Sequence, residues 1–280
     1  MAEVDYLRPA GLDEALEVMA RSGPAARVMA GGTDLIVNLR ERSVACKQVL
    51  DIKGIPEMHD LLYDPGKGLT VGGAVTISEL VTAGPVVRNY PILVEAGKTL
   101  ANALVRNRAT LVGNLCNASP AGDMAPAALV LGAKVIAASR AGQRSIPLEE
   151  FFVGVKMNAL RPDEIALRVE IPPAAGKGAY MRRSRIRGHD LSQVGVAGFL
   201  TDEGRLSLAL GAVAPVPVLI RDFDRVQREA LWRDAEVLAI VEKVKGRVNP
   251  ISDQRASREY RLAMVEYLTK QVLERLGRGV

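Results

Sequence analysis

Two glycine-bearing segments, far apart in the sequence, carry residue types suited to holding a phosphate-containing ligand. The first is Ala30-Gly31-Gly32-Thr33-Asp34-Leu35, and the second is Thr110-Leu111-Val112-Gly113-Asn114-Leu115. In both, glycines stand beside short hydroxyl, amide or carboxylate side chains, so the backbone can approach a ligand closely and offer it N–H groups. Two such segments facing one another would hold a diphosphate from both sides, which predicts a dinucleotide-type cofactor.

The first segment has a plainer alternative, because Gly31-Gly32 alone suits a tight turn between a strand and a helix. Thr33 and Asp34 favour the binding interpretation, since both side chains can bond ribose or phosphate groups where a helix begins. Neither the G-x-G-x-x-G pattern nor a P-loop occurs anywhere in the chain. The second segment runs on through Ser119-Pro120 to Asp123, a stretch that is either a ligand-facing loop or a proline-stiffened connection.

Metal-ligating residues are few: two cysteines, Cys46 and Cys116, and two histidines, His59 and His189. An iron–sulfur cluster normally takes four cysteine ligands, so this chain cannot house one by itself. A zinc site would need all of these residues to converge from unrelated positions, and buried thiols are the plainer interpretation. We therefore expect no metal ligands in this chain.

The net charge of +5 is mild, and part of it lies in one basic run that contains Arg182, Arg183, Arg185 and Arg187. In a strand, the last three would share one face and could bind nucleic-acid phosphates. Aromatic residues make up only 4% of the chain and none lies within this run, so platforms for base stacking are scarce. A stripe that faces a cofactor or a partner is favoured, and we expect no nucleic-acid binding.

The apolar runs are too short and too interrupted to span a bilayer. The first residues include Glu3 and Asp5 and lack the basic stretch and apolar run of a secretory signal. A cytoplasmic protein is therefore predicted. A length of 280 residues suits one large or two ordinary domains.

The hydrophobic pattern predicts a small α/β unit that ends at about residue 62. It begins with an amphipathic helix over 12–20, in which Leu12, Leu16 and Met19 recur at helical spacing. The remaining elements of this unit are a strand, a helix turn and a second strand over 26–30, 35–40 and 48–52. Beyond it, we predict helices over 77–83 and 91–99 and strands over 134–138 and 165–171.

The stretch from Pro172 to Gly178 combines two prolines with small and flexible residues, which makes it the best domain boundary in the sequence. After it, apolar and polar residues alternate in a way that favours strands. We predict strands over 179–186, 193–200 and 205–213 and helices around 229–241 and 257–276.

These motifs together resemble the medium, FAD-binding subunit of the molybdenum hydroxylases, typified by carbon monoxide dehydrogenase and xanthine dehydrogenase. The resemblance covers essentially the whole chain, with several motifs in one order. Besides the two glycine segments, it rests on residues 161–165, 170–172, 190–197, 211–217 and 252–261.

The resemblance implies an α+β fold in which two α/β subdomains form an FAD-binding domain of the PCMH/vanillyl-alcohol-oxidase type. That domain would cover residues 1–175, with subdomains at about 1–62 and 63–175. A smaller C-terminal domain of antiparallel sheet and helices would cover 176–280.

The resemblance also implies which residues contact FAD, and it assigns no catalytic residue to this chain. The two segments that would wrap the diphosphate contain Val28, Met29, Ala30, Gly31, Gly32, Thr33, Asp34, Leu35, Thr110, Val112, Gly113 and Asn114. Further contacts would come from Ala101, Asn117 and Asp123. Ile165 or Ala166 would lie where the family approaches the flavin, and Arg182 would lie near the isoalloxazine.

Three of these positions depart from the family. Val112 stands where the family usually has the first glycine of Gly-Gly-Asn, so the backbone there must suit a β-branched residue. Asn117 replaces the threonine or serine of many members. Arg182 stands where many members carry a lysine, and a planar guanidinium keeps the charge but not the geometry.

By resemblance, the chain is the electron-transfer subunit of a molybdenum hydroxylase. Its partners would be a large subunit with molybdopterin and a small subunit with 2Fe–2S clusters, in a dimer of heterotrimers. Electrons would pass from the clusters to FAD and then to NAD or another acceptor. We expect non-covalent FAD, because neither glycine segment carries a histidine and the nearby Cys116 is expected to be packed.

Two alternatives stay open at this point. A self-sufficient flavin oxidase or reductase of the same fold would need an acid–base residue in its own substrate pocket, for which His189 and Tyr260 are the only candidates. An assembly subunit with structural FAD would need no redox role.

Overall fold

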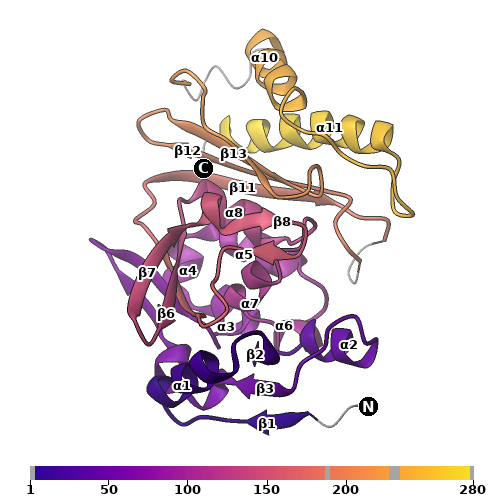
Figure 1. The fold of residues 1–280 in the computed structure, drawn as a ribbon. Helices are drawn as coiled ribbons and strands as arrows, with labels where there is room; N and C mark the ends of the chain where they lie inside the picture. Colours follow the sequence, from indigo (N-terminus) through magenta and orange to yellow (C-terminus); the bar gives the residue numbers. More distant parts are fainter. Residues whose placement is uncertain (1–3, 187–189, 227–233, 278–280) are drawn as a thin grey trace.

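The computed structural model describes residues 4–186, 190–226 and 234–277. Figure 1 shows three layers, which follow one another along the chain. A small N-terminal unit lies at one end, a five-stranded sheet with several helices lies in the middle, and a four-stranded sheet with two long helices lies at the other end. This mixture of helix and sheet confirms the predicted α+β class.

The N-terminal unit is a parallel sheet in the order β1-β3-β2. Its strands are β1 (Asp5–Leu7), β2 (Ala26–Met29) and β3 (Gln48–Asp51). The connecting helices are α1 (Leu12–Ser22) and α2 (Leu35–Arg40). The predicted helix is confirmed, because α1 buries Leu16 and Met19 in a core shared with Leu50 of β3. The first glycine segment is therefore the link between β2 and α2.

The middle unit is an antiparallel sheet in the order β4-β5-β10-β6-β7. Its strands are β4 (Leu61–Asp64), β5 (Gly68–Gly72), β6 (Lys134–Ser139), β7 (Gly142–Pro147) and β10 (Ile165–Ile171). A separate hairpin pairs β8 (Phe152–Gly154) with β9 (Met157–Asn158).

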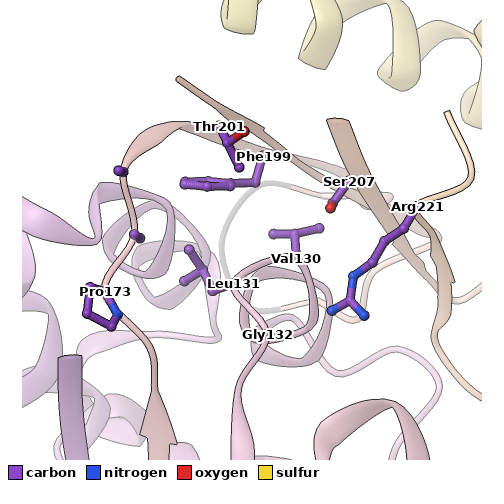
Figure 2. Close-up of a pocket in the computed structure, with 10 residues that line it drawn as sticks. Val130, Leu131, Gly132, Pro173, Phe199, Thr201, Ser207 and Arg221 are labelled. Carbon is purple, nitrogen blue, oxygen red and sulfur yellow. The ribbon is translucent and has the colours of Figure 1, made fainter. Parts of the chain in front are cut away.

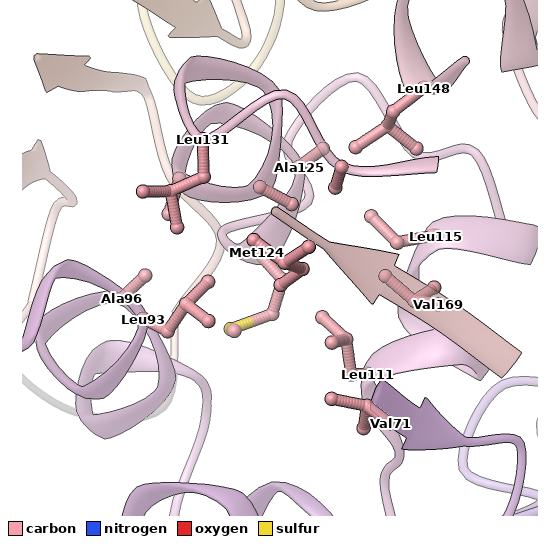
Figure 3. Close-up of a cluster of buried hydrophobic side chains, with 14 of the residues drawn as sticks. Val71, Leu93, Ala96, Leu111, Leu115, Met124, Ala125, Leu131, Leu148 and Val169 are labelled. Carbon is pink, nitrogen blue, oxygen red and sulfur yellow. The ribbon is translucent and has the colours of Figure 1, made fainter. Parts of the chain in front are cut away.

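Helices between β5 and β6 build the main core against this sheet. They are α3 (Ile77–Thr82), α4 (Gly84–Asn89), α5 (Pro91–Thr99), α6 (Ala103–Arg106), α7 (Leu111–Cys116) and α8 (Met124–Val130), and α9 (Leu148–Phe151) follows β7. Figure 3 shows Leu111 and Leu115 of α7 and Met124 of α8 among side chains from α5 and the sheet. The position of α7 is therefore held by burial of its apolar face.

The C-terminal unit is an antiparallel sheet of β11 (Gly176–Arg183), β12 (Val194–Thr201), β13 (Leu206–Gly211) and β14 (Val218–Ile220). Its two helices are α10 (Asp234–Lys245) and α11 (Arg258–Gly277). Side chains of β12 alternate between two cores: Val196 belongs to the core with α10 and α11, and Phe199 belongs to the main core with α8. The sheet is thus covered on both faces, and one face binds it to the middle unit.

The structure differs from the sequence predictions at several places. The second glycine segment forms the start of α7, a helix that the hydrophobic pattern did not predict, because Thr110 caps it. Strand β11 ends at Arg183, because the Asp190 carboxylate accepts the backbone N–H groups of Arg185 and Ile186 and turns the chain. The arginines at 183 and 185 therefore do not share a strand face, and Arg187 and His189 lie outside the described residues.

The helix predicted around 229–241 also differs, since α10 covers Asp234–Lys245 and the residues 227–233 are outside the described ranges. In the ranges that are described, no helix is long and apolar enough to cross a membrane. The same ranges contain no group of three or more histidine, cysteine, aspartate or glutamate residues that could hold a metal ion, and both cysteines are free thiols.

Candidate functional site

The first glycine segment is held in place by a buried ionic network at the end of β3. Asp51 is almost fully buried and accepts hydrogen bonds from Tyr6 and, at 2.5 Å, from the Lys53 ammonium. The same ammonium donates to the Ala30 carbonyl oxygen at 2.8 Å. Burial acts to raise the pKa of Asp51, but the hydrogen bonds from Lys53 and Tyr6 hold it below its ordinary value. Asp51 is therefore the anion that positions Lys53 against the glycine segment.

The two glycine segments contact each other, as a shared ligand site requires. A Cβ atom on Gly31 would lie 1.9 Å from the backbone oxygen of Arg108, which is two residues before the second segment. No residue other than glycine fits against that carbonyl without moving the backbone. Gly32 adopts φ +74°, a left-handed conformation that also favours glycine.

Three backbone donors of the first segment have no hydrogen-bond partner in the part of the chain that the structure describes. Among the described residues, the N–H groups of Gly31, Gly32 and Thr33 make no hydrogen bond. Free N–H groups at successive residues form a concave site for an anion. This donor set fits a phosphate-containing ligand.

The second segment presents a helix start with one orphaned polar atom. The Thr110 hydroxyl oxygen accepts the Gly113 N–H at 3.0 Å, which fixes the turn. Val112 is helical, and its side chain is buried in the main core, so a β-branched residue is tolerated there. The side-chain oxygen of Asn114 is buried without a hydrogen-bond partner, 3.4 Å from the position that a Cβ on Gly122 would take. A buried unsatisfied acceptor is costly and marks a position where a ligand donor would fit.

A second contact between the segments involves side chains from three parts of the chain. The Asn117 amide nitrogen donates to the Asp34 carboxylate at 2.7 Å. The Lys156 ammonium, from the turn between β8 and β9, donates to the Asn117 amide oxygen at 3.0 Å and lies 3.8 Å from the Asp34 carboxylate. These side chains lie at the edge where the two segments meet.

Asp123 and Arg182 form a buried ion pair between the middle and C-terminal units. One Asp123 oxygen accepts from Arg182 at 2.9 Å, and the other accepts from the Tyr180 hydroxyl at 2.9 Å and the Ser192 hydroxyl at 2.5 Å. The two charged side chains are 9% and 8% exposed. Burial raises the pKa of Asp123, and the Arg182 guanidinium opposes that rise. This network fixes the segment after α7 against β11.

The remaining residues predicted to contact the cofactor have buried or small side chains, so they would contact it mainly through their backbone. Ile165 and Ala166 begin β10, and both side chains are buried, one in the N-terminal core and the other in the main core. Ala101 has φ +43°, and its carbonyl oxygen accepts from Arg106 at 3.2 Å. The structure thus joins the two glycine segments and Asn117 in one place, and it joins Asp123 and Arg182 in another, linked by the chain from Asn117 to Asp123.

A cavity of about 210 Å³ lies elsewhere, at the C-terminal end of α8. Figure 2 shows Val130, Leu131 and Gly132 on one side of it and Phe199 and Arg221 on the other. None of the predicted ligand-binding residues lines this cavity. It is also smaller than the roughly 300–1,000 Å³ typical of small-molecule sites. The candidate site is therefore the junction of the two segments.

Sequence reasoning missed Lys53, Lys156, Tyr180 and Ser192. Tyr180 had a usable signal, because it stands two residues before Arg182 in a predicted strand and so shares its face. The two lysines had no such signal in the sequence, since their roles depend on which distant carbonyl or carboxylate the fold places beside them.

Comparison with known proteins identifies the family. Residues 2–174 match the family of FAD binding domains in molybdopterin dehydrogenase, and residues 179–276 match the CO dehydrogenase flavoprotein C-terminal domain. The chain therefore belongs to the FAD-binding subunits of the molybdenum hydroxylases, which are oxidoreductases. The resemblance seen in the sequence and the FAD cofactor are both confirmed.

Individual relatives cover nearly the whole chain. The xanthine dehydrogenase FAD-binding subunit of Escherichia coli O157:H7 is 30% identical over 96% of this chain and 94% of its own length. The carbon monoxide dehydrogenase medium chain of Hydrogenophaga pseudoflava is 27% identical, with 96% and 95% covered. Among solved structures, quinoline 2-oxidoreductase from Pseudomonas putida 86 matches with a TM-score of 0.88 and 29% identity over 98% of this chain and 96% of that one.

Proposed function

We propose that this chain takes electrons from 2Fe–2S clusters in a partner subunit and passes them to NAD or another acceptor. When bound, FAD supplies this chemistry, since flavins accept and release electrons, and the protein supplies binding and orientation. The observation that carries the proposal is the meeting of the two glycine segments, with free N–H groups on Gly31, Gly32 and Thr33. Relatives named as FAD-binding or medium chains of dehydrogenases support it.

The site residues inferred from the sequence form the proposed FAD contacts. The segments 28–35 and 110–114 would hold the diphosphate, with Asn117 as a further cofactor contact, and the direct contact between Gly31 and the backbone near Thr110 supports this. Ala101, Asp123, Ile165, Ala166 and Arg182 would contact the rest of the cofactor. The Asp123 carboxylate already accepts from three protein groups, which favours a role in holding Arg182 beside the flavin.

We further propose non-covalent FAD. Burial raises the pKa of the Cys116 thiol to about 12, so the reactive thiolate is suppressed at neutral pH.

We also propose the domain extents inferred from the sequence. The FAD-binding domain would cover 1–175, with subdomains at about 1–62 and 63–175, and the C-terminal domain would cover 176–280. The two family matches support this division, because the first ends at 174 and the second begins at 179.

The assembly of the complex belongs to the same proposal. A large molybdopterin subunit and a small 2Fe–2S subunit would join this chain in a dimer of heterotrimers, and medium-chain relatives of carbon monoxide dehydrogenases support the partner classes. A cytoplasmic location stays a prediction from the sequence.

A visible spectrum of the purified chain tests cofactor binding. We expect flavin absorption bands, saturation on titration with FAD, and complete release of flavin on denaturation because no covalent bond forms. A polypeptide that stays colourless after incubation with excess FAD would refute the proposal.

Stopped-flow absorbance of the purified complex tests the electron path. Substrate should bleach the flavin band, and an acceptor such as NAD should restore it. An assembly subunit would show no bleaching during turnover, whereas a self-sufficient oxidase or reductase would turn over without the partner subunits.

A further inference from the structure

The turn between β8 and β9 places a cation beside both glycine segments. Lys156 adopts φ +59°, a left-handed conformation that is uncommon for a lysine. Its backbone N–H donates to the Ala118 carbonyl oxygen at 3.0 Å, and Ala118 itself has φ +45°. Backbone in such conformations persists only where surrounding contacts hold it. The turn therefore has a fixed position against the chain that follows α7.

The Lys156 side chain reaches from this turn to residues of both segments. Its ammonium donates to Asn117, at the end of α7, and lies 3.8 Å from Asp34, at the start of α2. Both ionic side chains are about half exposed, at 50% for Lys156 and 52% for Asp34. An ion pair this exposed contributes little to folding stability. The Lys156 ammonium can therefore bind a more strongly charged anion without a large loss of folding stability.

The negative charges expected where the two segments meet favour a cation such as the Lys156 ammonium. The diphosphate of FAD is anionic, and Asp34 adds a negative carboxylate directly after the free N–H of Thr33. Lys53 is engaged with Asp51 and the Ala30 oxygen, and Arg182 is engaged with Asp123. Lys156 is bonded to Asn117, lies close to Asp34, and still has half of its side chain exposed.

We propose that Lys156 is an FAD-binding residue, whose ammonium donates to the diphosphate and bridges it to Asp34 and Asn117. The inference rests on the proposed FAD site and adds a third chain segment to it. A charge-assisted hydrogen bond of this kind is stronger than a neutral one and would hold the diphosphate at the edge where the two segments meet.

The test is FAD titration of the purified chain, followed by flavin fluorescence at several salt concentrations. Lys156→Asn removes the ammonium and keeps the left-handed turn, because asparagine tolerates that conformation. We expect the dissociation constant for FAD to rise about tenfold, mainly through faster release, and its dependence on salt to become shallower. Lys156→Arg should restore most of the affinity, because it restores the charge.

Lys67→Asn is the matched control, since Lys67 is an exposed lysine in the β4–β5 turn. It should bind FAD as the wild type does. Unchanged FAD affinity in Lys156→Asn would overturn the inference, because the lysine would then not contact the cofactor. A loss of FAD affinity that keeps the salt dependence of the wild type would also overturn it, because the lysine would then act only as a structural link. Failure of the wild type itself to bind FAD would instead refute the proposed function.

Discussion

Single residues at the junction of the glycine segments have sharply different tolerances. Gly31 lies against the backbone carbonyl of Arg108, whereas Val112 two residues into the other segment packs its side chain into the main core. The proposed cofactor site is therefore most sensitive to substitution where the two backbones are in contact, because only glycine, which has no side chain, permits that contact.

Gly31→Ala should lower the affinity for FAD at least about a hundredfold, which corresponds to roughly 2.7 kcal/mol. The reason is the 1.9 Å approach of the added Cβ to the Arg108 oxygen, which only a separation of the two segments relieves. FAD titration measures the affinity, and circular dichroism checks the fold. Gly246→Ala is the control, because its Cβ would meet neighbours at an ordinary 3.6 Å. Equal FAD affinity in the two variants would contradict the contact.

At the scale of elements, an ion pair anchors the start of the strand that carries Ile165 and Ala166. Arg144 of β7 donates two hydrogen bonds to Glu164, at 2.6 and 2.8 Å, across the intervening β6. Glu164 also accepts the Arg161 N–H at 2.7 Å, which closes the turn before β10. The Glu164 side chain thereby fixes the start of β10.

The Arg144–Glu164 pair should make stability depend on pH in acid. Hydrogen bonds from Arg144 hold the pKa of Glu164 below its ordinary value of 4.5. A lowered carboxyl pKa adds stability above the ordinary value, and this stability is lost as pH falls through the folded-state value. Urea unfolding of Glu164→Gln should show a loss on the order of 2 kcal/mol at pH 7 and a shallower decline from about pH 5 to 3.

Glu203→Gln serves as the control for that measurement. Its partner Arg205 is 2.8 Å away, but both side chains are about two-thirds exposed, so the change in stability should be near zero. Parallel acid unfolding curves for the wild type and Glu164→Gln would count against the role of the pair.

At the scale of the whole molecule, one buried network joins the middle unit to the C-terminal sheet beside the proposed flavin position. Asp123 accepts from Tyr180, Arg182 and Ser192, all of the C-terminal unit, and Figure 1 shows that unit lying over α5 and α8. A second link is the Glu95 carboxylate of α5, which accepts from the Tyr180 N–H and from Arg275 of α11. The units are therefore tied by ionic contacts as well as by the shared apolar core.

Asp123→Asn should destabilise the cofactor-free chain by on the order of 3 kcal/mol, because it removes the carboxylate charge that pairs with the buried Arg182 guanidinium. Chemical unfolding measures the loss. The double variant Asp123→Asn with Arg182→Met should lose less than the sum of the single changes, since both members of the ion pair are then removed together. Strict additivity would show that the two groups do not interact.

Residue pattern was enough to predict the β2–α2 glycine segment, α1, α5 and β10, because each has a clear period or glycine signature over a local stretch. It was not enough for α7, whose first turn depends on the Thr110 cap and on burial against distant helices. It also failed at the end of β11, where a carboxylate several residues later turns the chain.

The sequence by itself determined the family, the FAD cofactor and the two segments that would hold it, because these depend on residue types in a fixed order. Only the tertiary structure decided that Gly31 meets Arg108, that Arg182 pairs with Asp123 and that Lys156 reaches Asp34 and Asn117. Those contacts join residues separated by tens of positions along the chain. Local pattern carries no information on such pairings, because they arise from how separate cores pack together.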